Sequence, residues 1–421
     1  MKQTTVIAAL LALLVLCMFA VGCTPTGSEE TDTTEDTSTP EEVTTEAETE
    51  DIRFDYFEAD VSQFVTVDPS VYADMQVTLS QDLLVDDNDL TRYIMEMQFD
   101  NRGEAESDTM VDEPLEWGDD AYIYYTGYVE GVAFEGGSNM SNANPSQLGL
   151  GSSDFIDGFE AGLVGVIPSE TSKENPVRVS ARFPSWYTQA DLAGKEAVFE
   201  VYVVYAVEHE LPAYDVAFVR DVLLYEFKQE SYTDDSERLA EFEAQLRTHL
   251  EKSMVTLVEE ATFNAMWEYL LGQVTFASLP EEELAHYRNS YLDEIDMYYE
   301  YYTGYGYNVG TYDEFACTML GLAKGSDWKA EITKSVTRTV QCDVVRYAVA
   351  EIEGMKLITE AEMEAEIQYW VDYYRENYST EMTKDKILET LGQEALYRSA
   401  MVQKMHTFLL EHVTVSYATE A

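Results

Sequence analysis

Residues 122–137 read YIYYTGYVEGVAFEGG, and the expected fold of the middle of the chain follows from this stretch. Tyr122–Tyr125 is a run of aromatic and β-branched residues, which favour strands. Glu130-Gly131 predicts a turn between two further strand-like segments. A second strand-like run, AVFEVYVVY, occupies residues 197–205, and glycines and Pro184 interrupt the chain between the two runs. We therefore expect residues 116–210 to form a small twisted antiparallel sheet with little helix.

The apolar residues change from strand-like runs to helical spacing after this region. Ile332, Val336, Val340 and Val344 recur at every fourth residue, as expected for one face of a helix. Capping-box patterns predict helix starts; they lie at Ser278 to Glu281 (with Pro280 between them), Thr311 to Glu314 and Thr359 to Glu362. The sequence thus predicts an all-helical region over residues 211–421, and an α+β multidomain protein overall.

Residues 54–115 predict an extended arm with one helix. An acidic cluster, Asp86 to Asp89, precedes the apolar residues of that helix. An EF-hand calcium loop does not fit, because Thr91 stands where the loop needs glycine and no glutamate follows at the twelfth position. A helix N-cap followed by an acidic first turn accounts better for the cluster.

The N-terminus has the pattern of a bacterial lipoprotein signal over residues 1–22. An uncharged apolar run, Val6–Phe19, follows Lys2 and ends in Ala20-Val21-Gly22-Cys23. We expect Cys23 to be acylated; the alternative is an ordinary signal peptide with an incidental cysteine. Residues 23–53 predict a disordered acidic tether, because they are rich in Thr and Glu and poor in apolar residues. The pattern predicts a lipid-anchored protein on the extracytoplasmic face of the cell membrane.

The charge of the chain restricts its partners. It has 25 Lys and Arg against 81 Asp and Glu, a net charge of −56, whereas binding nucleic acid requires clustered basic residues. The five histidines are scattered without metal-ligand spacing, so we expect no metal site and no cofactor. Cys317 and Cys342 could form a disulfide in an exported chain, or could be two buried thiols on separate helices.

An ordered series of short motifs runs through residues 116–212. The motifs are Trp117-Gly118-Asp119, Tyr125-Thr126-Gly127, Gly131–Gly137, Leu150-Gly151, Phe155–Glu160, Phe183-Pro184 with Tyr187, Leu192–Phe199 and Leu211-Pro212. In this order they resemble the FKBP-type prolyl isomerase domain of bacterial trigger factor, and the resemblance extends over roughly residues 72–421. It implies an FKBP-type peptidyl-prolyl cis-trans isomerase domain over residues 116–210. It also implies a helical client-binding chaperone domain over residues 211–421.

The sequence departs from that family before residue 54. The family's basic ribosome-docking domain is replaced by the predicted signal, lipid site and acidic tether. The resemblance therefore implies unfolded or newly exported polypeptides with X–Pro bonds as partners, and no ribosome. The segment Ile167–Pro176 is also longer than the equivalent turn of the family.

The resemblance assigns the isomerase pocket to particular side chains of this chain. They are Tyr125, Phe134, Glu135, Phe155, Ile156, Phe159, Tyr187 and Phe199 in catalysis and Leu148 in substrate binding. Phe159 would form the floor, Phe155 and Ile156 would offer backbone groups to the peptide, and Glu135 would lie beside the twisted carbonyl. The alternative is that these rings are ordinary core of a small β domain.

Tyrosines in the helical region suggest a surface for unfolded segments. Tyr287, Tyr291, Tyr298 and Tyr302 have helical spacing, and Tyr305 and Tyr307 follow in a glycine-containing loop. Amphipathic rings suit adaptable binding of many clients. We interpret the 284–298 face as helix core. For Tyr302, Tyr305 and Tyr307, client contact and a plain tyrosine-rich loop both remain open.

These features predict a lipid-anchored foldase that isomerises X–Pro bonds and holds exported polypeptides. The first alternative is a non-catalytic holdase with an inactive pocket. A solute-binding lipoprotein fits poorly, because such proteins alternate β and α units whereas this chain has one β segment before a long helical segment. A tethered adhesin or scaffold is a further alternative, and one stable stoichiometric partner would distinguish it.

Overall fold

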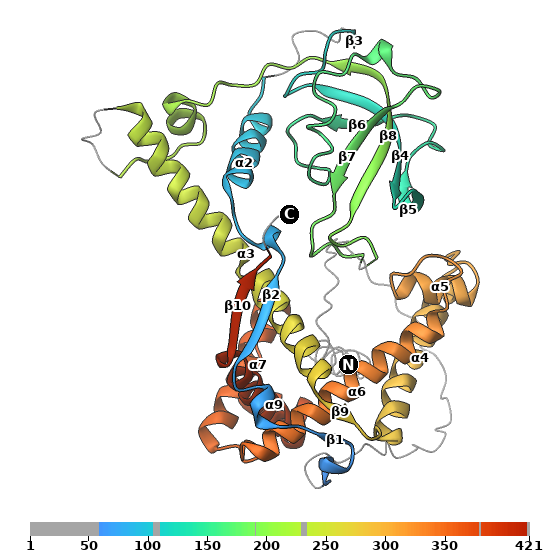
Figure 1. Cartoon of the computed structure of the whole chain (residues 1–421), viewed down its shortest axis with the longest axis vertical. Helices are drawn as coiled ribbons and strands as arrows, with labels where there is room; N and C mark the ends of the chain where they lie inside the picture. The colour runs from blue at the N-terminus through green and yellow to red at the C-terminus, as the bar shows by residue number, and fades with distance from the viewer. Residues whose placement is uncertain (1–58, 104–109, 190, 229–233, 379, 419–421) are drawn as a thin grey trace, which may run out of the picture. The chain divides into compact units, whose positions relative to one another are not determined.

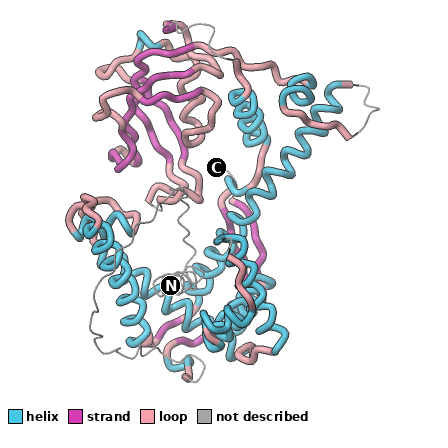
Figure 2. Tube along the Cα trace, turned by 180° about the vertical axis from the view of Figure 1, so that it is seen from behind, coloured by secondary structure: helices cyan, strands magenta, loops and turns pink. Residues whose placement is uncertain are grey.

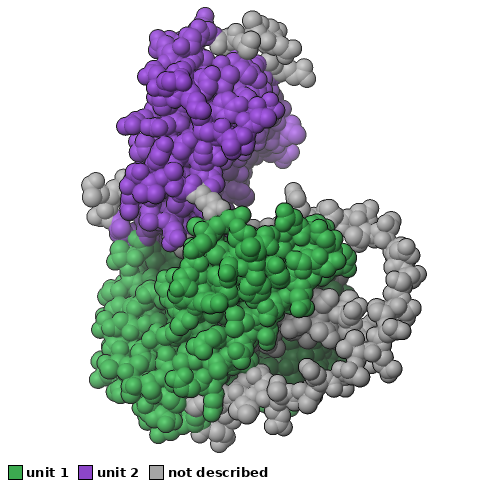
Figure 3. Space-filling view, turned by 90° about the vertical axis from the view of Figure 1, so that its right-hand side faces the viewer, with its two compact units in different colours: residues 1–79, 260–416 green, residues 80–259, 417–421 purple. Residues whose placement is uncertain are grey.

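The computed structural model describes residues 59–103, 110–189, 191–228, 234–378 and 380–418. The predicted signal, Cys23 and the acidic tether lie outside these residues. The chain divides into two compact units (Figure 3). Unit 1 comprises residues 1–79 and 260–416, and unit 2 comprises residues 80–259 and 417–421. Figure 2 shows most strands gathered in unit 2 and helices making up most of unit 1.

Unit 2 contains a six-stranded antiparallel sheet. Its strands are β3 (Met110–Val111), β4 (Asp120–Val129), β5 (Val132–Ser138), β6 (Ser146–Gly149), β7 (Val177–Arg182) and β8 (Glu196–Val207). The order is β3-β8-β4-β5, with β6 paired to β4 and β7 paired to β8. The predicted antiparallel sheet is therefore confirmed.

Local sequence explains why these strands form. Along β8, buried and more exposed residues alternate, with Ala197, Phe199, Val201 and Val203 all pointing into the core. The predicted turn lies between β4 and β5, where Glu130 and Gly131 both have positive φ, 52° and 78°. Two consecutive positive φ values are typical of the tight hairpin turns whose twist matches that of the strands.

Unit 2 also contains helices. They are α2 (Asp87–Asp100), a π-helix (Phe218–Val222), the N-terminal part of α3 (Asp235–Gln273) and the 3-10 turns η3 (Gln81–Leu83) and η4 (Pro168–Glu170). The Asp86 side chain accepts hydrogen bonds from the backbone N–H groups of Asn88 and Asp89 and forms a capping box with Asp89. The acidic cluster is thus a helix N-cap, as predicted.

Unit 1 is mainly helical. Besides the rest of α3, its helices are α4 (Glu281–Gly304), α5 (Tyr312–Met319), α6 (Trp328–Ile352), α7 (Glu360–Tyr378), α8 (Lys384–Leu391), α9 (Gln393–Glu411) and the 3-10 turns η1 (Val61–Gln63) and η2 (Pro69–Val71). The helical prediction is confirmed. The structure adds short strand pairs: β1 (Val65–Thr66) with β9 (Thr275–Phe276), and β2 (Met75–Leu79) with β10 (Val413–Tyr417).

The core of unit 1 is built around α6. Val340, Val344, Val345 and Val349 on this helix have no exposed surface. They pack with buried residues of α3 and α9 and with the N-terminal arm, in one cluster. None of the helices in the described ranges is both long enough and apolar enough to cross a membrane.

The helix-start predictions are correct at two positions and wrong at one. Thr311 with Glu314, and Thr359 with Glu362, exchange the backbone and side-chain hydrogen bonds of capping boxes. At the start of α4, in contrast, Pro280 is the N-cap and no side chain caps the helix. The Pro280 carbonyl accepts a hydrogen bond from the backbone N–H of Leu284, so the helix starts at Glu281 without Ser278.

The disulfide suggested for Cys317 and Cys342 is not present. Both are free, buried cysteines. Cys317 lies on α5 and packs with Phe315 and Trp328, whereas Cys342 lies on α6 in the central cluster around Val340. The alternative of buried thiols on separate helices is correct, because each side chain fills a different apolar core. Burial raises the pKa of Cys342 to about 11, so this thiol is protonated and unreactive at neutral pH.

Candidate active site

A cluster of aromatic rings lies on the inner face of the β sheet of unit 2. Phe199 comes from β8, Tyr125 from β4, and Phe155 and Phe159 from the connection after β6. The ring centre of Phe159 lies 4.9 Å from that of Phe199, 4.4 Å from that of Phe155 and 6.0 Å from that of Tyr125. The structure therefore brings these predicted pocket residues together from separate segments.

A second group of rings continues the cluster. Phe134 on β5 lies 6.0 Å from Phe199 and 5.6 Å from Phe183, with edge-to-face geometry in both pairs. Phe183 in turn lies 4.6 Å from Tyr187. Phe183 was absent from the predicted site although it belongs to the quoted motif. Phe183 directly follows β7 and lies two residues after buried Ala181. Because side chains two residues apart in a strand point to the same face, this spacing could have predicted that Phe183 faces the core.

The members of the cluster differ in the surface that they expose. Phe159 and Leu148 are buried, at 0% and 1% exposure, so they support the site from beneath. Tyr125, Phe134, Phe155, Ile156 and Tyr187 are only partly buried. The Phe159 ring is covered by Phe155, Tyr125 and Phe199, so it offers no exposed surface to a ligand. The half-buried residues are therefore the contact surface available to a peptide.

Glycine makes the close packing of these rings possible. A Cβ atom at Gly127 would lie 2.5 Å from Phe199 and 2.7 Å from Phe134, far inside van der Waals contact. Nearby, the buried Asn139 side chain accepts a hydrogen bond from the backbone N–H of Tyr125 at 2.6 Å and donates one to the carbonyl of Ile123 at 2.9 Å. These contacts fix the part of β4 that carries Tyr125.

The segment that carries Phe155 and Ile156 is held by a buried carboxylate. Glu160 is 8% exposed and accepts hydrogen bonds from the backbone N–H groups of Gly151 and Ser153, at 2.8 Å and 3.3 Å, and from the Ser152 hydroxyl. Glu160 is thus a positioning residue of the loop. Glu160 ends the motif Phe155–Glu160, but the motif predicts no role for it.

The electrostatics of the site are those of an apolar environment. Burial raises the pKa of the Tyr125 hydroxyl above its ordinary value, so the phenol is protonated at neutral pH and can donate a hydrogen bond. The backbone of Glu135 lies in β5, but its side chain is outside the described part, and its role remains a prediction. The described residues hold no group of three or more His, Cys, Asp or Glu side chains that could bind a metal ion.

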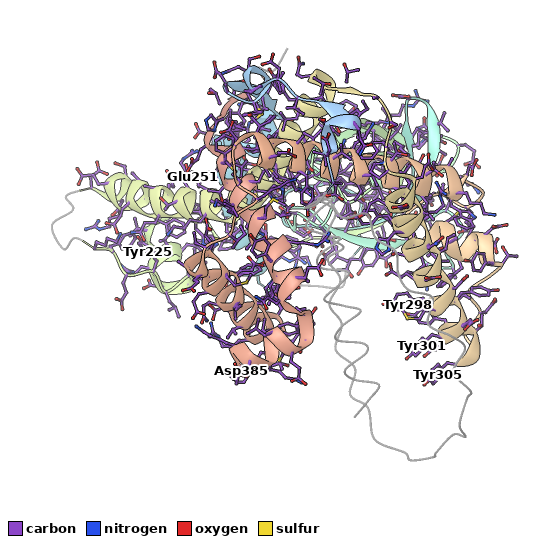
Figure 4. All side chains as sticks on the ribbon, turned by 90° about the horizontal axis from the view of Figure 1, so that it is seen from below. Tyr225, Glu251, Tyr298, Tyr301, Tyr305 and Asp385 are labelled. Carbon is purple, nitrogen blue, oxygen red and sulfur yellow. The ribbon has the colours of Figure 1, made fainter. Side chains whose placement is uncertain are left out.

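The tyrosines of unit 1 separate into a partly buried and an exposed set. Tyr287, Tyr291 and Tyr298 pack against the apolar cores of unit 1. Tyr302, Tyr305 and Tyr307 are 37%, 72% and 63% exposed, and Tyr301 is 55% exposed. Figure 4 shows Tyr298, Tyr301 and Tyr305 following one another along the C-terminal end of α4. The exposed rings also contact each other, with Tyr301 and Tyr305 at 4.8 Å.

Comparison with known proteins agrees with this geometry. Residues 112–204 match the family of FKBP-type peptidyl-prolyl cis-trans isomerases. Trigger factor of Geobacillus kaustophilus is 28% identical over 357 residues, which cover 84% of this chain and 74% of the relative. Trigger factor of Shouchella clausii is 30% identical over 320 residues, covering 75% and 66%. The chain is a trigger-factor-like protein.

Further comparisons of this trigger-factor-like protein also match trigger factor. Trigger factor of Alkaliphilus metalliredigens is 28% identical over 308 residues, and the matched part spans only 64% of that relative's length. A solved structure from a study of promiscuous substrate recognition by the trigger factor chaperone matches with 14% identity and a TM-score of 0.33, covering 82% of this chain and 73% of that one.

Proposed function

We propose that this trigger-factor-like protein accelerates cis–trans isomerisation of X–Pro bonds in polypeptides and holds unfolded segments. The observation that carries the proposal is the ring cluster around Phe199. The chain region that matches the FKBP-type isomerases supplies its rings from several strands and loops, and the rings at its edge remain partly exposed.

The chemistry of the reaction explains why aromatic carbon suits it. Amide resonance makes the barrier to rotation of a peptide bond about 18–20 kcal/mol. Water stabilises the polarised, planar amide, so an environment without water favours the twisted and less polar bond. No nucleophile or proton donor is required. Lowering the barrier by about 6 kcal/mol corresponds to roughly 10⁴-fold in rate.

The described residues can supply this environment. Phe134, Tyr187 and Phe155 offer faces and edges to a proline ring, while buried Phe199 and Phe159 keep them in place. The protonated Tyr125 hydroxyl is available as a donor to a peptide carbonyl. Glu135 is retained as the polar residue beside the bond, by resemblance alone.

An isomerisation assay on a proline-containing peptide tests the catalytic part. We expect the full chain to accelerate the reaction and Phe155→Ala to lower kcat/KM about tenfold, because one buried aromatic face is lost from the contact surface. Tyr202→Ala is a matched control. Tyr202 lies on the same sheet but on the opposite face of β8, where it stacks with Tyr124 at 6.2 Å.

The result also distinguishes the alternative function. If the wild-type chain leaves the rate unchanged but suppresses aggregation of an unfolded protein, the chain is a non-catalytic holdase. The contact of Phe155 with the fully buried Phe159 favours that alternative, because it leaves the floor covered. Equal activity of wild type and Phe155→Ala would contradict the assigned pocket.

The holding part of the proposal is assigned to the exposed end of α4. Tyr302, Tyr305 and Tyr307, together with Tyr301, present adjacent rings that contact one another and remain partly exposed. Such rings bind apolar segments at little conformational cost and tolerate many sequences. Unfolded or newly exported polypeptides are the proposed clients. The net charge of −56 supports partners other than the ribosome, since RNA phosphate attracts basic surfaces.

We further propose that Cys23 is acylated and anchors the chain to the extracytoplasmic face of a membrane. The support is the sequence Ala20-Val21-Gly22-Cys23 after an apolar run. The wild-type chain should sediment with membranes, and Cys23→Ala should move it to the soluble fraction, because two acyl chains suffice for stable anchoring. A Cys317→Ala variant is the matched control and should stay with the membrane. Soluble wild-type protein would contradict the anchor.

A further inference from the structure

Two faces of helix α2 pack against different parts of unit 2. Leu90, Tyr93, Ile94 and Met97 pack into an apolar cluster with Phe218, Val219 and the N-terminal part of α3. Another face of α2 lies toward the β domain. It carries Asn88, Arg92, Met95 and Phe99, which follow one another at helical spacing. Figure 1 shows α2 between the sheet and α3. The helix therefore joins the β domain to α3 as part of one unit.

Specific contacts hold α2 against the β domain. The Phe99 ring covers Gly149 so closely that a Cβ atom there would collide with it, and Met95 lies over Gly151. Gln98 donates a hydrogen bond to the Pro212 carbonyl at 2.6 Å. Just after the helix, Arg102 pairs with Asp120 at 2.8 Å and stacks on the Phe99 ring at 3.7 Å. These contacts keep the position of α2 fixed relative to the sheet.

A cavity of about 240 Å³ remains between α2 and the loop after β6. On the helix side it is lined by Asn88, Thr91, Arg92 and Met95. On the domain side its lining includes Trp117, Phe155, Ile156 and Ala161. Phe155 and Ile156 also belong to the ring cluster. The cavity and the proposed catalytic surface therefore share one wall.

We propose that this cavity is a specificity subsite that binds an apolar side chain one or two residues from the proline of a peptide substrate. The inference rests on the proposed isomerase function. An extended peptide advances about 3.3 Å per residue, so a chain crossing Phe155 and Ile156 places a neighbouring side chain over the cavity. Helix α2 would thus add a wall from outside the isomerase domain to its substrate site.

The size and chemistry of the cavity fit a side chain. Its volume is below the roughly 300 Å³ at which pockets for whole small-molecule ligands begin. Met95, Trp117, Phe155 and Ile156 provide an apolar interior, and the flexible thioether of Met95 can adapt to different shapes. Asn88, Thr91 and Arg92 line the helix side with polar groups that can bond a peptide backbone.

Binding measurements on the full chain test the subsite independently of catalysis. The parent peptide has one proline and otherwise alanine. In each test peptide a single leucine replaces one alanine, at the first or second position before the proline or at the first or second position after it. We expect leucine at one of these positions to tighten Kd, measured by calorimetry, about tenfold relative to the alanine parent. Met95→Trp and Ala161→Phe fill the cavity from opposite walls, and each should abolish the gain that leucine gives over the alanine parent measured on the same variant.

Asp100→Trp is the control variant, because it adds the same ring to α2 at an exposed position that does not line the cavity. It should retain the tenfold gain. Three results would overturn the subsite. They are equal affinity for all peptides, no measurable binding, and an affinity gain from leucine that persists in both Met95→Trp and Ala161→Phe. Isomerisation of the same peptides is measured in parallel. If the leucine gain is present without acceleration, the proposed catalysis fails and the subsite stands.

Discussion

Replacing Asp343 by alanine is expected to destabilise unit 1 by about 3–5 kcal/mol, because it leaves a buried positive charge without its partner. Asp343 and Arg346 are 5% and 3% exposed and form an ion pair one turn apart on α6. Tyr287 also donates a hydrogen bond to Asp343 at 2.9 Å. The Arg346 guanidinium lies 5.4 Å from the centre of the Trp267 ring.

The surroundings of Arg346 explain the size of this effect. Burial by itself would lower its pKa, but the neighbouring Asp343 carboxylate raises it above the ordinary value, so the side chain remains charged. Its Nε and Nη2 atoms have no hydrogen-bond partner among the described residues. Without Asp343, the charge would depend on the Trp267 face alone.

Hydrogen exchange of α6 peptides at increasing urea measures this prediction. Glu268→Ala is the matched control, because Glu268 pairs with Arg338 of the same helix but is 67% exposed at its side chain. Such surface pairs contribute about 0–1 kcal/mol. The double variant Asp343→Leu with Arg346→Met removes both charges and should recover most of the loss. A loss under about 1 kcal/mol for Asp343→Ala would contradict the assignment of a buried pair.

Unit 1 is also expected to lose stability in mild acid because of His406 on α9. Burial, and then the charge of Arg346, hold the pKa of His406 well below 6.5. Its ring lies 4.6 Å from Phe263 and 6.2 Å from Trp267, and its Nε2 atom has no hydrogen-bond partner in the described ranges. The folded state therefore keeps this imidazole neutral.

The direction of the effect follows from proton linkage. Below pH 6.5 the unfolded chain binds a proton at His406 that the folded chain does not bind, so stability falls by about 1.4 kcal/mol per pH unit. The loss therefore grows as the pH falls below 6.5, and it levels off only below the depressed folded pKa of His406. The pKa of the Glu362 carboxyl is lowered from 4.5 to about 2, so this group adds to the loss of stability only at lower pH than His406 does.

Hydrogen exchange of α6 and α9 between pH 7.5 and 5.0, corrected for intrinsic exchange rates, measures the loss. His406→Phe should make stability nearly independent of pH in this interval, because phenylalanine suits the same apolar surroundings. His249→Phe serves as the control, since His249 is exposed on α3. An identical pH dependence in wild type and His406→Phe would refute the role of His406.

Much of the fold and part of the candidate site were predictable from local patterns. Alternation along residues 197–203 and the Glu130-Gly131 turn predicted the sheet, and the spacing of Ile332, Val336 and Val340 predicted α6. The resemblance to the FKBP-type isomerase domain implied which rings would be neighbours. Three features of the site were not predictable, because each depends on how separate segments pack. They are the contact of Phe155 with Phe159, the position of Phe183 in the ring cluster and the hydrogen bonds by which Glu160 holds its loop.

Short-range sequence was therefore sufficient for the strands, the turn and most helix starts, because backbone sterics, side-chain periodicity and capping act within a few residues. Folding in three dimensions determined the rest. It placed Cys317 and Cys342 in different cores, buried the Asp343–Arg346 pair that its spacing would assign to a helix surface, and brought α2 against Gly149 to enclose a cavity. These contacts join residues that are distant along the chain or depend on burial, and local spacing carries no information about either.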